Sequence, residues 1–308
     1  MGGRVTSSFH EPVLAGVVRE WAAGATRAVD GTAGGGGHTA ILLGAGARVL
    51  AIDRDPEALG AARDRLGDAG VEWLASPFGA PAALERVRLF RPDRILLDLG
   101  VSSHQLDAEG RGFTFRPGAP LDMRMTPDAG VSAADILNTW GEERLGETFA
   151  EDADEPRARK LARIVVRRRQ RDPFLTSDDF VNAIRETLGP RSGPGDFARL
   201  FQALRIAVNG EREQLTRALP AFRDALVPGG RLAVIAYHSG EDRVVKHAFR
   251  EWGRDCVCPP GQPICTCRGR ALGHVRTRKA VTPGPEELAA NPRSRSAHFR
   301  DFEVTGGP

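Results

Sequence analysis

The fold is decided by the stretch TRAVDGTAGGGGHTAILL, residues 26–43, together with RVLAID at residues 48–53. A short apolar run ends at Asp30, four glycines follow, and an apolar segment of helical length begins at His38. Glycines in such a turn let the backbone pass close to a ligand, and the N–H groups that open a helix carry positive partial charge. The stretch therefore predicts strand, loop, helix and strand. A loop of this kind is shared by several classes of nucleotide-binding protein and by plain turns.

The same rhythm continues outward from this stretch. Apolar runs predict strands at residues 26–30, 48–53, 71–75 and 94–99. Segments of helical length lie between them at residues 38–43, 56–66 and 81–90, the last two opened by Pro56 and Pro81. Strands that alternate with helices predict an α/β fold with a parallel, doubly wound sheet.

The alternation of strands and helices is interrupted between residues 107 and 210. A Gly/Pro-rich loop at 111–127 leads into helical patterns at 157–171, 177–188 and 196–209. A helix at 211–226 and a strand at 231–237 then resume the α/β pattern, and residues 273–278 and 297–304 predict the last strands. We therefore expect a discontinuous core, residues 1–107 and 211–308, with a helical insertion domain for substrate recognition at 108–210.

The composition is that of a folded, water-soluble protein, with 27% charged and 41% hydrophobic residues. No stretch reaches the roughly 18 apolar residues of a membrane span, and the first residues hold no signal-peptide core. We expect a cytoplasmic location and no membrane partner. Only Lys160, Lys246 and Lys279 are lysines, so arginine carries the positive charge. Arginine suits phosphates and bases, although a GC-rich genome explains the same bias.

Polar or aromatic residues follow three of the predicted strands. Asp53 ends the second strand, where a carboxylate can accept both ribose hydroxyls of an adenosine; capping the helix at Pro56 is the alternative, for which Asp55 is better placed. Phe78 follows the third strand and can pack on adenine or in the core. Asp98 ends the fourth strand at the ligand-binding edge, as a partner of a cationic ligand or as a cap.

Four segments closely resemble those of the bacterial 16S rRNA cytosine-N4-methyltransferases: residues 9–14 (FHEPVL), 30–38 (DGTAGGGGH), 98–107 (DLGVSSHQLD) and 237–243 (YHSGEDR). The likeness continues in order through residues 112–125, 158–160, 203–209 and 293–297. One departure is Tyr237, where the family usually has Phe.

This resemblance implies a Rossmann-like class I methyltransferase that depends on S-adenosylmethionine and carries a helical insertion. It implies that the methyl acceptor is the exocyclic N4 amine of a cytidine in the decoding centre (P site) of 16S rRNA, in the assembled or nearly assembled small subunit. The implied contacts to the methyl donor are Gly36, Gly37, His38, Asp53, Phe78, Asp98 and Gln105.

Methyl transfer from a sulfonium requires no metal, but the amino nitrogen of cytosine shares its lone pair with the ring. We expect Asp98, or Ser102 with the Leu99 carbonyl, to accept the hydrogens of this amine. His238 and Ser239 are expected to line the opposite strand end as further catalytic residues. The alternative for His238 is a hydrogen-bonded polar residue that closes a buried strand.

The aromatic side chain that stacks on the base is not identified by the sequence. Phe113, Phe115 and Tyr237 are the candidates. RNA loops and junctions present bases that can be turned out into such a pocket.

A strongly basic segment, residues 157–171, predicts RNA binding, with Arg167, Arg168 and Arg169 as its centre. The alternative is a solvated helix face paired with the acidic stretch at residues 147–155.

All four cysteines, Cys256, Cys258, Cys265 and Cys267, form two Cys-x-Cys pairs separated by six residues. They can supply four thiolates to one Zn²⁺. Free thiols are the alternative, and disulfides are not expected in the cytoplasm.

Two other functions fit parts of the sequence. An NAD-dependent oxidoreductase would use the glycine loop and Asp53, but it would require a second α/β lobe where the helical insertion is predicted. A non-catalytic RNA-binding ribosome-assembly factor would use the arginines, but it would not need the glycine loop and the segment after Asp98 together.

Overall fold

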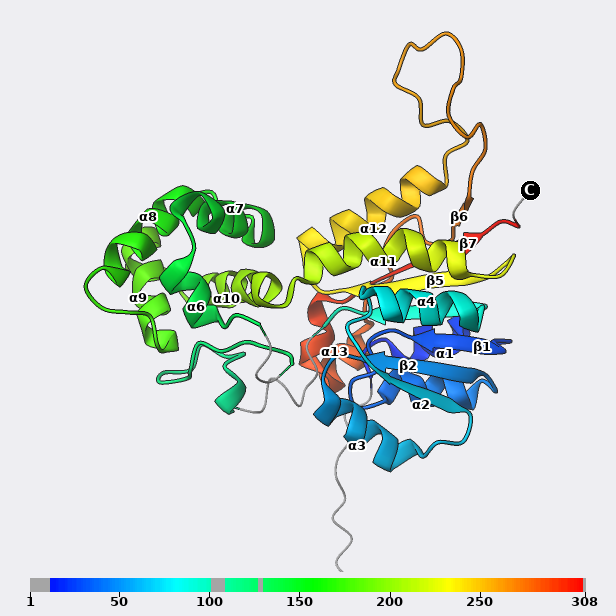
Figure 1. Cartoon of the computed structure of the whole chain (residues 1–308), viewed down its shortest axis with the longest axis horizontal. Helices are drawn as coiled ribbons and strands as arrows, with labels where there is room; N and C mark the ends of the chain where they lie inside the picture. The colour runs from blue at the N-terminus through cyan, green and yellow to red at the C-terminus, as the bar shows by residue number, and fades with distance from the viewer. Residues whose placement is uncertain (1–11, 101–108, 127–129, 307–308) are drawn as a thin grey trace, which may run out of the picture. The chain divides into compact units, whose positions relative to one another are not determined.

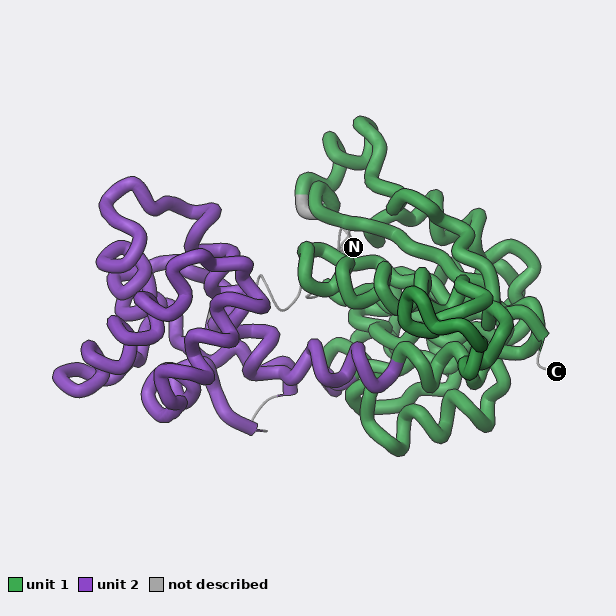
Figure 2. The backbone as a smooth tube through the Cα atoms, turned by 90° about the horizontal axis from the view of Figure 1, so that it is seen from above, with its two compact units in different colours: residues 1–53, 57–100, 219–308 green, residues 54–56, 101–218 purple. Residues whose placement is uncertain are grey.

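A computed structural model of the chain describes residues 12–100, 109–126 and 130–306 (Figure 1). The chain forms two compact units, coloured green and purple in Figure 2. Unit 1 comprises residues 1–53, 57–100 and 219–308, and unit 2 comprises residues 54–56 and 101–218. In the described residues, no helix is long and apolar enough to cross a membrane.

Unit 1 contains a seven-stranded sheet in the order β3-β2-β1-β4-β5-β7-β6. Its strands are β1 (Arg27–Asp30), β2 (Arg48–Asp53), β3 (Val71–Ala75), β4 (Arg94–Asp98), β5 (Arg231–Ala236), β6 (Gly273–Val275) and β7 (His298–Val304). The strands from β1 to β5 pair in parallel, whereas β7 is antiparallel to both β5 and β6. The predicted α/β class and wound sheet are confirmed. The sheet is mostly parallel, and β7 differs because it enters next to β5 from the opposite end.

The sheet is apolar on both faces, since helices cover both. Leu50 and Ile52 of β2 face one side while Val49 and Ala51 face the other, and all four are fully buried. Unit 1 contains the helices α1 (Ala15–Trp21), α2 (Gly37–Gly44), α3 (Pro56–Leu66), α4 (Pro81–Phe90), α12 (Ser239–Trp252) and α13 (Pro285–Ala290), and the short 3-10 helix η2 (Pro292–Ser296). The helices α1 and α2 share one core with a face of the sheet, and α4 and α12 lie on the other side (Figure 1).

Unit 2 is helical in its described part. It contains η1 (Glu109–Arg111), α6 (Ala133–Thr139), α7 (Glu142–Ala153), α8 (Ala158–Arg169), α9 (Ser177–Leu188) and α10 (Pro194–Asn209), and α11 (Glu211–Ala225) begins here and ends in unit 1. Its core is built on phenylalanines: the rings of Phe149 and Phe180 stack at 5.8 Å, and those of Phe180 and Phe201 lie 5.3 Å apart. The assignment of residues 108–210 to substrate recognition stays a prediction.

Candidate functional site

Three aspartates mark one edge of the sheet. Asp30, Asp53 and Asp98 are the last residues of β1, β2 and β4, which are parallel neighbours in the sheet. The chain leaves β1 toward β2 on one side, while β4 pairs with β1 on the other, so the strand order reverses here. Ligands of wound sheets bind outside the carboxyl ends of the strands at such a reversal. The aspartates therefore surround the expected ligand site.

The glycine loop between β1 and α2 is held against β2. The backbone N–H of Gly34 donates a hydrogen bond to Oδ2 of Asp53 over 2.7 Å. Gly36 caps α2 with φ +79°, and a Cβ at this position would lie 2.9 Å from Cδ1 of Leu66. Both the left-handed backbone and the lack of space require glycine at this position. Asp53 therefore orders the loop, in addition to any contact it makes with a ligand.

Two of the strand-end carboxyl groups are poorly hydrated. Asp30 is fully buried, and its carboxylate accepts hydrogen bonds from Oγ1 of Thr39 over 2.7 Å and from the Thr32 N–H over 3.3 Å. Burial raises the pKa of Asp30 above its ordinary value. Burial also raises the pKa of Asp98, and the imidazole of His38 and the phenol of Tyr237 partly offset this rise.

Asp98 is positioned by its backbone, and one of its carboxyl oxygens lacks a partner among the residues described. Its N–H donates to Oγ1 of Thr32 over 2.7 Å, which ties the end of β4 to the glycine loop. Its Oδ2 lies 3.5 Å from Nδ1 of His38. Its Oδ1 is buried and has no hydrogen-bond partner among the residues that the structure describes. A buried acceptor without a partner costs stability, so this oxygen is a natural point of contact for a ligand.

The hydrogen bonds of His38 determine where a proton must lie. Nε2 is 2.9 Å from the carbonyl oxygen of Val13. A carbonyl only accepts, so Nε2 carries the hydrogen, and Nδ1 of a neutral ring is then an acceptor. Nδ1 faces the Asp98 carboxyl group and lies 3.5 Å from its Oδ2.

Tyr237 closes the end of β5. A Cβ on Gly100 would lie 2.7 Å from Cε2 of the Tyr237 ring, so glycine is required where the ring packs. The backbone N–H of Tyr237 donates to Oε2 of Glu241 over 3.1 Å. Burial, reinforced by the Asp98 carboxyl group, raises the pKa of Tyr237, so its hydroxyl stays protonated and remains a donor.

His238 and Ser239 begin α12. Nδ1 of His238, the N-cap of this helix, accepts a hydrogen bond from the Glu241 N–H over 3.4 Å, and its Nε2 lies 2.9 Å from Oε1 of Glu241. The ring thus has a structural role at the helix start, and a catalytic role for it stays a prediction. Ser239 is exposed in the first turn, and its catalytic role also remains a prediction.

The other residues predicted to contact the methyl donor lie in different surroundings. Phe78 is partly exposed after β3, and its ring lies 6.5 Å from that of Phe222, so it packs on the core with one side accessible. A Cβ on Gly37 would lie 3.0 Å from Cβ of Pro12, so a larger residue at this position would require Pro12 to shift. Ser102 and Gln105 lie outside the described residues, and their roles stay predictions.

The predictions from the sequence did not include Asp30, Thr39 or Glu241 as parts of this edge, and they included Tyr237 only as a candidate for stacking on the base. Asp30 had a usable signal, because it ends a strand directly before the glycine loop, as Asp53 and Asp98 end theirs. Glu241 had a weaker signal, an acidic residue three positions after a strand-end His238. No sequence pattern indicates that these groups share one buried network.

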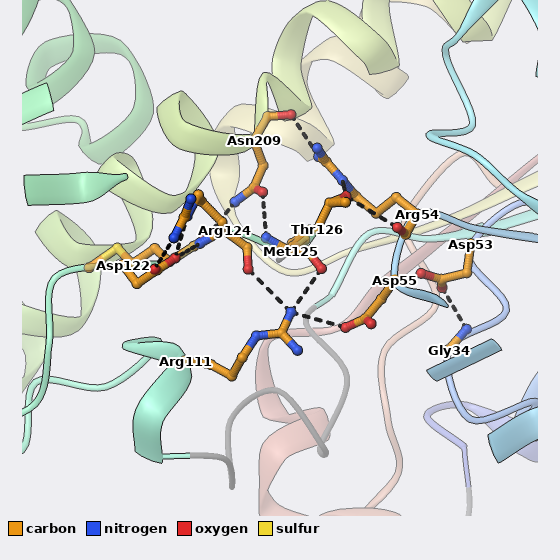
Figure 3. A network of polar contacts seen from close by, with 11 residues as sticks. Gly34, Asp53, Arg54, Asp55, Arg111, Asp122, Arg124, Met125, Thr126 and Asn209 are labelled. Atoms are coloured by element: carbon orange, nitrogen blue, oxygen red, sulfur yellow. Dashed lines mark hydrogen bonds and ion pairs between the residues drawn. The ribbon is translucent and has the colours of Figure 1, made fainter. Parts of the chain in front are cut away.

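A second polar network lies within unit 2 (Figure 3). The side chain of Asn209 accepts a hydrogen bond from the Met125 N–H over 2.9 Å and donates one to the Met123 carbonyl over 2.8 Å. The guanidinium of Arg111 donates to the Met125 carbonyl over 2.8 Å and lies 3.1 Å from Oδ2 of Asp55, which is fully buried. These bonds join the irregular segment at residues 121–126 to α10, η1 and residue 55.

The three predicted RNA-binding arginines at the end of α8 differ in their surroundings. Arg167 and Arg168 both pair with Glu186 of α9 and remain more than a third exposed. Arg169 instead donates to the carbonyls of Leu137 over 2.9 Å and Trp140 over 2.7 Å. RNA binding by these arginines stays a prediction, with Arg167 and Arg168 the more accessible pair. The acidic partner is in α9 and not in the stretch at 147–155.

The structure brings the four cysteines together. The Sγ atoms of Cys256, Cys258, Cys265 and Cys267 all lie within 4.8 Å of one another, in the loop between α12 and β6.

The chain matches the MraW methylase family over residues 7–305. A protein of Gemmatimonas aurantiaca named ribosomal RNA small subunit methyltransferase H is 56% identical over 299 residues, which cover 96% of this chain and 95% of the relative. A protein of the same name from Heliobacterium mobile is 46% identical over 283 residues, 88% of this chain and 90% of its own. Among solved structures, an rRNA methylase from Streptococcus thermophilus covers 94% of this chain and 93% of its own, with a TM-score of 0.38 and 13% identity, a likeness too weak to support an argument.

Proposed function

The chain belongs to the MraW methylase family, and we propose that it transfers a methyl group from S-adenosylmethionine to the N4 amine of a cytidine in the decoding centre of 16S ribosomal RNA. The observation that carries the proposal is the set of strand-end aspartates beside the glycine loop in a class I methyltransferase fold. The name shared by the curated relatives supports small-subunit ribosomal RNA as the substrate.

The residues at this edge fit the donor. S-adenosylmethionine has a sulfonium cation, a ribose diol and an adenine, and when bound it supplies an electrophilic methyl group. Asp53 is placed to accept the ribose hydroxyls, and Gly36, Gly37 and His38 would lie beside the methionine portion. Oδ1 of Asp98, which has no partner within the described part of the chain, is an acceptor suited to a cationic ligand. Phe78 and Gln105 complete the proposed donor contacts.

The chain's own groups then act on the attacking amine. Its lone pair becomes available when acceptors bind both amino hydrogens, and its excess proton must leave after attack. Asp98 is proposed for this role, since its raised pKa makes its carboxylate a stronger base than an exposed aspartate. Ser102 with the Leu99 carbonyl is the alternative acceptor, and His238 and Ser239 are proposed to line the far side of the base.

Unit 2 is proposed to hold the RNA. Arg167 and Arg168 offer exposed guanidinium groups on α8 for phosphate contacts. The elements of its described part are helices, which gives no support to the second α/β lobe of an NAD-dependent oxidoreductase. The proposed substrate is the assembled or nearly assembled small subunit in the cytoplasm.

The test uses small subunits from cells that lack this protein. We expect the purified protein and labelled S-adenosylmethionine to place N4-methylcytidine at one decoding-centre position, detected by nuclease digestion and mass spectrometry. Free 16S rRNA serves as the comparison substrate and should react less. Methylation of another atom or another region would contradict the proposal. Donor binding with no methylation of either substrate would point to an assembly factor.

A further inference from the structure

The loop between α12 and β6, residues 253–272, keeps a defined shape without a core. It contains neither helix nor strand, and none of its residues from 254 to 270 is buried. In Figure 1 it extends away from the sheet, beyond the end of α12. Long loops without buried side chains have little to offset the entropy of ordering them. Something other than apolar packing must therefore hold its outer part.

The four cysteine sulfurs of this loop converge on one point. The Sγ–Sγ distances are 3.9 Å for Cys256–Cys265, 3.8 Å for Cys258–Cys265, 3.4 Å for Cys265–Cys267 and 3.9 Å for Cys256–Cys267. All four sulfurs lie within 4.8 Å of one another.

These distances match a tetrahedral metal site. With Zn–S bonds of about 2.3 Å, the ligands of a tetrahedral tetrathiolate lie about 3.8 Å apart. A disulfide would bring its two sulfurs to within about 2.05 Å of each other, and the four cysteines form no disulfide with one another. Free thiols have no reason to gather in fours at an exposed position, because each is a weak hydrogen-bonding group that water can satisfy.

We propose that Cys256, Cys258, Cys265 and Cys267 bind one structural Zn²⁺ through four thiolates. Four protein ligands leave no open position for a substrate or a water molecule, so the ion is structural and not catalytic. The backbone N–H of Val257 already points at Sγ of Cys267 over 3.3 Å. Hydrogen bonds of this kind orient metal ligands from the second layer around the ion.

The ion fixes the outer part of the loop, and ordinary hydrogen bonds fix the rest. At the base, the Leu272 N–H donates to the Trp252 carbonyl over 2.8 Å, and Arg268 donates to the carbonyls of Glu251 and Arg254. Between the two cysteine pairs, Nε2 of Gln262 donates to Oγ1 of Thr266 and to the neighbouring Ile264 carbonyl. The metal therefore connects the two arms of the loop, whose base and turn are already held by hydrogen bonds.

The first test is the metal content of the full-length protein, purified without chelators and measured by mass spectrometry. We expect about one zinc per chain, and less than about a tenth of an equivalent in a Cys258→Ser/Cys267→Ser variant. Thr266→Ser, in the same loop, is the matched control and should keep the ion. Iron in place of zinc, or wild-type protein with less than about a tenth of an equivalent, would overturn the proposal.

A second measurement does not depend on the variants folding. Co²⁺ exchanged into the wild-type protein should give the visible absorption of a tetrahedral site and the near-ultraviolet band of thiolate-to-metal charge transfer. Chelation should release four reactive thiols and speed tryptic cleavage after Arg254, Arg268 or Arg270, while leaving the affinity for S-adenosylmethionine unchanged. An octahedral cobalt spectrum, or four thiols that react equally fast before chelation, would refute the site.

Discussion

Replacement of Asp53 by alanine tests the site through a single hydrogen bond. Oδ2 of Asp53 accepts the Gly34 N–H over 2.7 Å, and this bond positions the glycine loop. A hydrogen bond to a charged group contributes about 1.5–3 kcal/mol. If the bond holds the loop in its binding conformation, its loss weakens S-adenosylmethionine binding by about 10- to 150-fold. Loss of the proposed ribose contacts moves the result toward the upper end of this range.

The assay is isothermal titration of the folded protein with S-adenosylmethionine. Asp53→Asn keeps an oxygen acceptor without the charge, so we expect a smaller loss of about 3- to 10-fold. Asp64→Ala removes the same charge from an exposed position of α3 and should leave the affinity unchanged. In kinetics, KM for the donor should rise while kcat at saturation changes little. An Asp53→Ala affinity within about twofold of the wild-type value would refute the reasoning.

Three further changes address other parts of the molecule. Asp98→Asn should lower the methylation rate at least about tenfold. Burial raises the pKa of Asp98, so its contribution to stability is present below the unfolded-state pKa and is lost as pH rises through the folded-state pKa; the Asn variant should be the more stable protein at neutral pH by thermal unfolding. An unchanged rate at saturating donor would remove Asp98 from the mechanism. Asn209→Ala leaves two backbone groups of unit 2 without their hydrogen-bond partner, and it should lower the free energy of unfolding in urea by about 2–4 kcal/mol. A decrease below about 1 kcal/mol would mean that water replaces the amide. Arg167→Ala/Arg168→Ala should weaken RNA binding and reduce its salt slope by about 2 without loss of stability, whereas Arg169→Ala should destabilise unit 2. Unchanged RNA affinity and an unchanged salt slope would show that Arg167 and Arg168 do not bind RNA.

The strands of the sheet were predictable because their physical environment is simple. β2, β4 and β5 are buried on both faces, so nearly every residue in them must be apolar, and runs such as residues 49–52 identify them directly. The helices α3 and α4 begin with Pro56 and Pro81, which fixed their starts. The predicted bounds of β2, α3 and α4 agree with the structure to the residue, and those of β4 and β5 agree to within one residue.

Two of the missed elements, α1 and α12, lack such a signal. α1 has only seven residues, and its N-cap Leu14 is left-handed and makes no capping bond. The N-cap of α12 is His238, which is not a common capping residue. α6 did carry a signal, the capping box of Ser132 and Asp135, which went unused. The direction of β7 follows from the path of residues 276–297, which no alternation pattern encodes.

For the site, the sequence located the carboxylates but not their protonation. Strand-end position alone identifies Asp53 and Asp98. That Nδ1 of His38 faces Asp98 depends on the contact of Nε2 with the Val13 carbonyl, 25 residues before the ring. The raised pKa of Asp98 depends on burial, which is a property of the folded edge. Both the contact and the burial are visible only in the folded structure.

The electrostatics of this edge also discriminate between the rival cofactors. A dinucleotide would bring its doubly charged pyrophosphate to the glycine loop, beside Asp30 and Asp98, two carboxyl groups whose pKa values burial has already raised. Each negative charge added in such a poorly hydrated place either causes a carboxyl group to take up a proton or weakens the binding of the dinucleotide. A sulfonium has the opposite sign and favours the ionised form of Asp98, the form that can accept the hydrogen of the attacking amine. In the proposed mechanism the charge that binds the donor also prepares the base, and this coupling favours a methyl donor over a hydride donor at the same edge.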